Sequence, residues 1–86
     1  MKYRISRHAR EEMERRNISS EILESVLKEP QQVVNDLTGK KIYQSKVDFG
    51  QGMTKLVRVV IVEEAGLPVV VTVYRTSKVE KYWRKT

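Results

Sequence analysis

The sequence predicts an α+β protein in which two N-terminal helices pack on one face of a curved, four-stranded antiparallel sheet, in the order α-α-β-β-β-β. Three observations predict this class. Apolar residues recur at helical spacing through the first thirty positions, β-branched segments fill most of the remainder, and short turn sequences separate those segments. A length of 86 residues fits one domain, which we place at 1–86.

Residues 6–16 are expected to form the first helix. Its apolar stripe consists of residues that recur every four positions, Ile5, Ala9 and Met13. Ser6 is suited to cap the first turn, and Asn17 is suited to the left-handed conformation that ends a helix. Glu12 and Arg16 form an acid-before-base pair four residues apart, and the acidic side chains of this helix are expected on its solvated face.

A second helix is expected within a few residues of the first. Either Ser19 or Ser20 can cap it, and Pro30 ends it because proline disfavours helical geometry in the residue before it. Its apolar face comprises Ile22, Leu23, Val26 and Leu27. These side chains are therefore expected to cover the sheet.

The rest of the chain is expected to form an antiparallel meander. The predicted strands are 31–36, 40–49, 54–62 and 68–75, and the predicted turns are 37–39, 50–52 and 63–66. Residues 76–86 form either a short helix or an ordered tail, two alternatives that the sequence leaves open.

Strand alternation assigns side chains to the two faces of this sheet. The apolar set Val57, Val59 and Ile61 is expected to face the helices. The opposite face is expected to carry Arg58, Thr72, Tyr74 and Thr76, above a floor of Val60, Val62 and Val70. A basic face with hydroxyls and an aromatic ring suits single-stranded RNA, and an ordinary solvent-facing sheet is the alternative. Arg75 has the opposite parity and joins this face only where the strand ends or bulges.

The composition excludes several classes of protein. There is no cysteine, which excludes disulfides, thiolate metal sites and a cysteine nucleophile, and a single histidine excludes a histidine-rich metal site. No apolar run is long enough to cross a bilayer, and the first ten residues lack the apolar stretch of a secretory signal. We therefore expect a cytoplasmic protein with no membrane partner, in which a dimer or a bound partner can add stability to a small core.

The charge distribution predicts a polyanionic partner. The net charge is +6, and it is concentrated at the two ends of the chain. Residues 1–10 hold four basic residues and no acid, and residues 75–86 hold five basic residues and one acid. Such ends are typical of proteins that bind nucleic acid or an acidic protein, although they also serve solubility alone.

Two segments carry a resemblance to a known family. The opening run of residues 5–18 (ISRHAREEMERRNI) and the closing run of residues 71–83 (VTVYRTSKVEKYW) resemble the family catalogued as domain of unknown function 4258. So do the proline-ended second helix and the hairpin around Tyr43. That family remotely resembles the RelE and BrnT type toxins. The resemblance implies a curved antiparallel sheet, metal-independent RNA cleavage and an acidic antitoxin as partner.

Metal-free RNA cleavage uses the 2′-hydroxyl as nucleophile, and it needs proton-transfer groups and cations at the phosphate. His8 is predicted to be the acid or base because its usual pKa lies near neutrality, and Arg7 and Arg10 flank it to hold phosphate. The alternative is a structural histidine that bonds a backbone carbonyl beside the apolar stripe. If His8 lies on the helical layer and Arg58 on the other face, the two can meet only at an edge or end of the sheet.

The predicted site combines these helical residues with groups from the sheet. The catalytic set is His8, Arg58, Thr72 and Tyr74. The substrate-binding set is Arg7, Arg10, Arg75, Thr76 and Lys78. Neither a metal site nor a cofactor is expected.

Two other readings of the residues stay open. The chain can be a non-catalytic module that binds RNA or an acidic protein, or a small interaction subunit without a nucleic-acid role. Tyr82 and Trp83 can stack on bases, or they can fold back onto the core.

Overall fold

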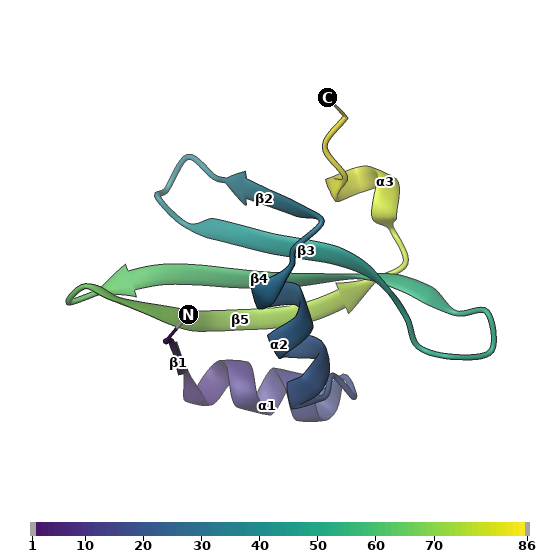
Figure 1. Cartoon of the computed structure of the whole chain (residues 1–86), viewed down its shortest axis with the longest axis horizontal. Helices are drawn as coiled ribbons and strands as arrows, with labels where there is room; N and C mark the ends of the chain where they lie inside the picture. Colours follow the sequence, from purple (N-terminus) through teal and green to yellow (C-terminus); the bar gives the residue numbers. More distant parts are fainter. Residues whose placement is uncertain (1, 86) are drawn as a thin grey trace.

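The computed structural model describes residues 2–85 and has the predicted α+β class (Figure 1). Its helices are α1 (Arg7–Arg15), α2 (Ser20–Lys28) and α3 (Val79–Tyr82). Its strands are β1 (Arg4–Ile5), β2 (Gln32–Asn35), β3 (Lys41–Asp48), β4 (Thr54–Glu64) and β5 (Leu67–Thr76). Within the described residues, no helix has the length and apolar character needed to span a membrane.

The five strands form one mixed sheet in the order β1-β5-β4-β3-β2. Strands β2 to β5 are the predicted antiparallel meander. The prediction of four strands misses β1, which pairs in parallel with β5 by aligning Arg4 with Val69 and Ile5 with Val70. A two-residue strand has no readable periodicity, and this pairing arises only because the chain runs beside β5 before it enters α1.

Helix α1 begins and ends at the predicted signals. The hydroxyl of Ser6 accepts a hydrogen bond from the backbone N–H of Ala9 at 3.1 Å, which satisfies a free donor of the first turn. Asn17 follows the helix with a φ of 54°, the left-handed conformation that asparagine tolerates.

Helix α2 is capped by Ser19, which resolves the alternative between two serines. The Ser19 hydroxyl accepts from the backbone N–H of Ile22 at 3.2 Å, and Ser20 is the first helical residue. At the other end Glu29 leaves helical geometry with φ −136° and ψ 68°, as expected of a residue before proline.

The hairpin between β4 and β5 is tighter than predicted. Glu63 and Glu64 belong to β4 and pair with Pro68 and Leu67, so the expected turn over residues 63–66 is wrong at its start. The connection is two residues, Ala65 and Gly66, and both have positive φ (51° and 78°). Such a two-residue turn matches the twist of the flanking strands, which extends the pairing to the end of the hairpin.

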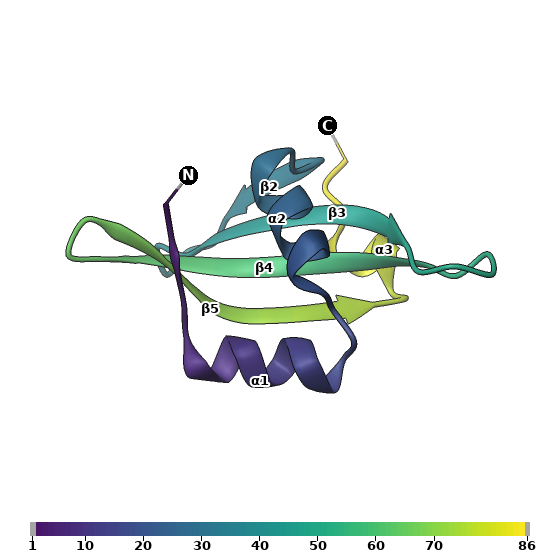
Figure 2. The ribbon, with the colours of Figure 1, turned by 60° about the horizontal axis from the view of Figure 1, so that its bottom comes forward.

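Both long helices pack on the same face of the sheet. The main core cluster consists of Ala9, Met13, Ile18, Leu23, Val26, Leu27, Val57, Val59, Ile61, Val70 and Val73. Its β4 members are the three residues predicted to face the helices. Figure 2 shows α1 running alongside β5, with α2 in front of the middle of the sheet. The opposite face therefore stays clear of α1 and α2.

A β-bulge corrects the predicted faces of β5. The register pairs Val60 with Thr72 but Ile61 with Val70, so Val71 is an extra residue on β5. Consequently Val70 joins Ile61 in the helix-facing core, and its predicted place in the floor of the opposite face is wrong. A run of three valines carries no signal for a one-residue shift. Beyond the bulge, residues 72–76 keep the predicted alternation.

The final segment adopts the helical alternative, in part. Helix α3 spans four residues and contributes no buried residue. Figure 1 shows it beyond the end of β5. We call residues 77–85 the C-terminal segment. Hydrogen bonds from Gln32 and Gln44 to the backbone of Tyr82 and Arg84 hold this segment over the face that α1 and α2 leave clear.

Candidate functional site

A row of four polar residues crosses the sheet on the face opposite the two long helices. Gln32 of β2, Gln44 of β3, Arg58 of β4 and Tyr74 of β5 are directly paired neighbours in the strand register. Their side chains are joined in sequence by hydrogen bonds of 2.7, 2.8 and 2.6 Å. We call these four residues the polar row. The register of three adjacent hairpin pairings therefore aligns one continuous hydrogen-bonded chain of side chains.

Arg58 is the charged member of the polar row. It is 8% exposed, and its Nε donates to Gln44 Oε1 while its Nη1 donates to the hydroxyl of Tyr74. Within residues 2–85 it forms no ion pair, whereas Arg4, Arg7, Arg15 and Arg16 each pair with a glutamate. A largely buried guanidinium without a carboxylate is costly in an isolated protein, and it is well suited to an anionic ligand.

One nitrogen of Arg58 is free for such a ligand. Nη2 has no hydrogen-bond partner in the described part of the chain, where every fully buried side-chain nitrogen or oxygen has one. Nη2 is therefore in contact with solvent. Because Gln44 and Tyr74 fix the other two nitrogens, the guanidinium presents Nη2 from a fixed orientation, as a preorganised donor for a phosphate oxygen.

Two tyrosines enclose the guanidinium. Its central carbon lies 4.2 Å from the ring centroid of Tyr82 and 5.8 Å from that of Tyr74. The two rings meet edge to face with their centroids 6.2 Å apart. Cation–π attraction favours this placement of a guanidinium beside aromatic rings.

The surroundings move the pKa values of these phenols in opposite directions. Burial raises the pKa of Tyr74 above its usual value, against the lowering effect of the Arg58 guanidinium. Burial also acts to raise the pKa of Tyr82, but Lys81, Tyr74 and Arg58 together hold that pKa below its usual value. A pair of titratable groups separated in this way is suited to act as acid and base.

The C-terminal segment is held over the polar row by hydrogen bonds to its main chain. Gln44 Nε2 donates to the Tyr82 carbonyl at 3.2 Å. Gln32 bonds the backbone of Arg84 twice, donating to its carbonyl at 2.6 Å and accepting from its N–H at 3.0 Å. Lys46 adds a cation–π contact, with its Nζ 4.2 Å from the ring centroid of Trp83. Polar and cationic groups thus attach this segment to the sheet.

The structure brings part of the predicted site together. Thr72 and Thr76 lie on the same face as Arg58, paired with Val60 and Leu56, and the backbone N–H of Lys78 donates to Thr76 Oγ1 at 3.1 Å. The predicted alternation of these strand residues is therefore confirmed.

Arg75 lies on the helix-facing side of β5, as its parity required. It pairs with the core residue Val57, and its guanidinium lies 4.3 Å from the ring centroid of Phe49. The bulge at Val71 precedes Arg75 and does not bring it to the other face. Arg75 and Arg58 thus do not share one pocket.

The structure does not bring His8 together with the sheet residues. His8, Arg7 and Arg10 are exposed on α1, which packs through Ala9 and Met13 on the opposite face of the sheet from Arg58. Arg7 lies 3.5 Å from Glu11, an ion pair within the helix. The hypothesis of one cavity shared by the imidazole, Arg58 and the strand hydroxyls is therefore wrong.

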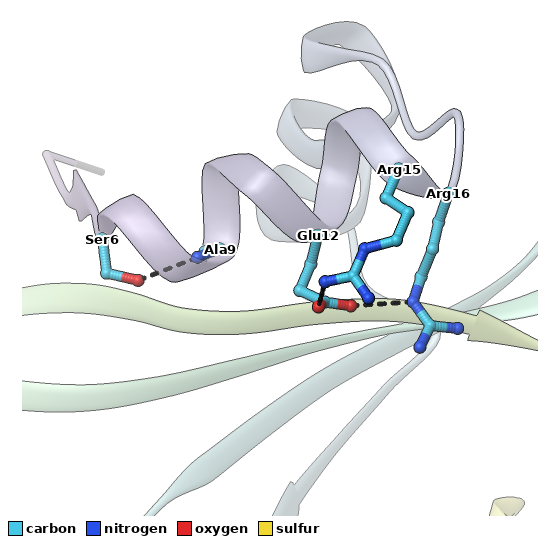
Figure 3. Close-up of polar contacts among 5 residues, drawn as sticks. All are labelled: Ser6, Ala9, Glu12, Arg15 and Arg16. Carbon is cyan, nitrogen blue, oxygen red and sulfur yellow. Dashed lines mark hydrogen bonds and ion pairs between the residues drawn. The ribbon is translucent and has the colours of Figure 1, made fainter.

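Helix α1 has a separate ion-paired cluster at its C-terminal end (Figure 3). Glu12 is only 7% exposed, so its expected place on a solvated face is wrong. Its carboxylate accepts hydrogen bonds from Arg15 and, at 2.9 Å, from Arg16. The bond from Arg16 and the charges of Arg15, Arg16 and His8 hold the pKa of Glu12 below its usual value, although burial opposes them. The two arginines of this cluster share an internal carboxylate, whereas Arg58 has none among the described residues, which leaves Arg58 as the stronger candidate for an anion.

Sequence reasoning overlooked Gln32 and Gln44, and for Tyr82 it offered only base stacking or packing on the core, with no part in proton transfer. A signal for Gln44 was present, because a hairpin centred on Gln51 places Gln44 opposite Arg58. For Tyr82 there was no such signal, since its position depends on how the C-terminal segment folds back over the sheet.

Comparison with known proteins identifies the family. No group of three or more histidine, cysteine, aspartate or glutamate side chains that could hold a metal ion occurs within residues 2–85. No curated protein and no solved structure matches the chain. The family described as "Domain of unknown function (DUF4258)" matches residues 5–75, which include the whole polar row. The chain therefore belongs to the DUF4258 family.

Proposed function

We propose that the protein is a toxin-like, metal-independent endoribonuclease whose phosphodiester site lies at Arg58. The observation that carries this proposal is a guanidinium held by two hydrogen bonds, without a carboxylate partner among the described residues, with Nη2 open to solvent. A fixed donor of this kind binds a non-bridging phosphate oxygen and stabilises the charge that develops there during cleavage. The location of RNA in the cell makes the cytoplasm the proposed site of action.

The two tyrosines supply the proton transfers of the proposed reaction. In this reaction the deprotonated form of Tyr82, which a lowered pKa favours, takes the proton of the 2′-hydroxyl, whose oxygen then forms a bond to phosphorus. The bond from phosphorus to the 5′-oxygen breaks, and Tyr74 gives its proton to that oxygen. The products are a 2′,3′-cyclic phosphate and a 5′-hydroxyl, and a proton passed from Tyr82 to Tyr74 restores the starting state. This pair replaces His8, which lies across the sheet.

The surface around Arg58 supports RNA as the substrate. Lys46, Lys78 and Lys81 are exposed around the site, and the half-buried ring of Trp83 lies beside Lys46. Cations that follow a phosphate backbone, together with aromatic rings on which bases stack, are the features of single-strand binding. The same cations suit an acidic antitoxin as a protein partner.

Cleavage of a defined single-stranded RNA in the presence of a chelator tests the proposal. We expect the wild-type protein to leave 2′,3′-cyclic phosphate ends, and we expect Arg58→Gln and Tyr82→Phe to lower the rate by about 100-fold or more. Gln51→Ala, in the exposed turn between β3 and β4, is the matched control and should cleave as the wild type does.

Two outcomes decide between cleavage and binding alone. Salt-dependent RNA binding without any cleavage product identifies a non-catalytic binding module of the same fold. Cleavage that is unaffected by Arg58→Gln contradicts the proposed site.

A further inference from the structure

Gln44 is an uncharged member of the polar row, and its hydrogen bond with the charged member, Arg58, holds that guanidinium in place. Gln44 is fully buried and makes three side-chain hydrogen bonds. Its Oε1 accepts from Arg58, and its Nε2 donates to Gln32 and to the Tyr82 carbonyl. Glutamate has the same length and the same acceptor, and it is the usual partner of a buried arginine. An amide at this position holds the guanidinium without neutralising it.

We propose that Gln44 is a positioning residue of the Arg58 site, and that its lack of charge keeps the guanidinium available to a substrate phosphate. This inference rests on the proposed function in taking RNA as the natural ligand, and it extends to any phosphate compound that reaches Arg58. Gln44 fixes Arg58 from one side and the C-terminal segment from the other. It acts through Arg58 and does not itself contact the phosphate.

The requirement for an uncharged side chain beside Arg58 can be tested by placing a carboxylate at positions that differ in their distance from the guanidinium. A carboxylate at position 44 keeps the hydrogen bond from Arg58 but pairs with its charge. A carboxylate at position 32 lies one strand further from Arg58, because Gln44 stands between them. A carboxylate at position 51 adds the same net charge in an exposed turn outside the row. The effect on phosphate binding should therefore decline in that order.

The test compares Gln44→Glu, Gln32→Glu and Gln51→Glu with the wild type in binding to a single-stranded RNA and to inorganic tripolyphosphate. We expect Gln44→Glu to weaken both by at least about tenfold and to lower the salt dependence of RNA binding by about one phosphate contact. Gln32→Glu should have a smaller effect, and Gln51→Glu the smallest. Circular dichroism and thermal melting verify that each variant is folded.

Gln44→Met distinguishes the effect of a negative charge at position 44 from the effect of losing the hydrogen bonds that Gln44 makes. Methionine has a similar length but loses all three hydrogen bonds and adds no charge. If Gln44 served only the structure, Gln44→Met would impair binding at least as much as Gln44→Glu, which keeps the bond to Arg58. We expect the reverse order of impairment. If Gln44→Glu does not fold, the comparison of Gln32→Glu with Gln51→Glu decides, and equal binding by those two overturns the proposal.

The two ligands distinguish this inference from the proposed function. If the wild type binds tripolyphosphate but not RNA, and Gln44→Glu abolishes that binding, the role of Gln44 stands and the ribonuclease proposal fails. If the wild type binds RNA and the three glutamate variants bind it equally, the role of Gln44 is overturned and the ribonuclease proposal survives. Binding of neither ligand by the wild type overturns both.

Discussion

At the scale of single residues, the arginines differ in whether a carboxylate pairs with them. Arg4, Arg7, Arg15 and Arg16 each pair with a glutamate, which reduces the positive charge that they offer to a ligand. Arg58 instead pairs with an amide and a phenol. A polyanion therefore gains more at Arg58 than at those four arginines, because no carboxylate among the described residues has to be displaced from it.

His8→Ala tests the reassignment of proton transfer to the tyrosines. The imidazole is exposed on α1, on the other side of the sheet from Arg58, so its removal should leave the rate of RNA cleavage unchanged. Single-turnover cleavage of the same RNA by the wild type and the variant is the measurement. A large loss of rate in His8→Ala, with an unchanged melting temperature, would show that α1 carries the catalytic group.

Glu12→Gln tests the ion-paired cluster of α1 through the pH dependence of stability. The folded-state pKa of Glu12 is lowered, chiefly by the hydrogen bond from Arg16. Its contribution is therefore fully present above the unfolded pKa of about 4.3 and is lost as the pH falls through the folded-state value. We expect Glu12→Gln to melt at a lower temperature than the wild type at pH 7, and this difference to shrink in acid.

Glu14→Gln is the control for that experiment, because Glu14 is exposed on the same helix and forms no ion pair within the described residues. Its melting temperature should follow that of the wild type throughout. A difference between Glu12→Gln and the wild type that is the same at pH 7 and in acid would contradict the role of the carboxylate charge.

At the scale of elements, local signals in the sequence were sufficient for the helices and for most of the sheet. Ser6, Asn17 and Pro30 marked helix ends correctly because capping and proline geometry act within a few residues. Strand β1 and the bulge at Val71 were not predictable, since both arise from how distant segments align. The helical layer was thus readable from sequence, whereas the fine register of β5 was not.

Ser19→Ala tests the cap of α2 at this scale. Removal of the hydroxyl leaves the N–H of Ile22 without its partner, which should lower the free energy of unfolding by about 1 kcal/mol. Ser20→Ala, one residue later and inside the helix, should change it by less than about 0.5 kcal/mol. Urea denaturation of both variants provides the comparison, and equal losses would argue against Ser19 as the cap.

Truncation after Thr76 tests the C-terminal segment. Because α3 contributes no buried residue, the shortened chain should keep its circular dichroism spectrum and a cooperative melting transition. It loses Tyr82, so RNA cleavage should fall by about 100-fold or more. Truncation after Trp83 retains Tyr82 and should retain most of the activity. An active chain ending at Thr76 would exclude Tyr82 as the base.

At the scale of the whole molecule, the two faces of the sheet have different roles: one builds the apolar core and the other carries the candidate site. One face packs against α1 and α2 and supplies the main apolar core, and the other carries the polar row beneath the C-terminal segment. Sequence alternation predicted this division and put Arg58 and Tyr74 on the second face. It failed for His8, because a helix on the first face cannot reach a site on the second.

The side-chain chemistry of the candidate site explains which of its residues were predictable from the sequence. Arg58 and Tyr74 have side chains whose chemistry points to a phosphate, and both were predicted. Gln44 and Gln32 are neutral, and their importance appears only when the register places them in line with Arg58. Tyr82 depends on a segment that folds back after β5, beyond the reach of strand periodicity.

The most direct test of this account is the side-chain N–H signal of Arg58 in a ¹H–¹⁵N NMR spectrum, assigned with Arg58→Gln, during titration with a non-cleavable 2′-deoxy-substituted RNA. We predict a large, saturable shift of the Arg58 signal at low salt, greater than that of the Arg7 and Arg10 signals on α1. An Arg58 signal that stays in place while the α1 signals shift would contradict the account and place the RNA on the opposite face of the sheet.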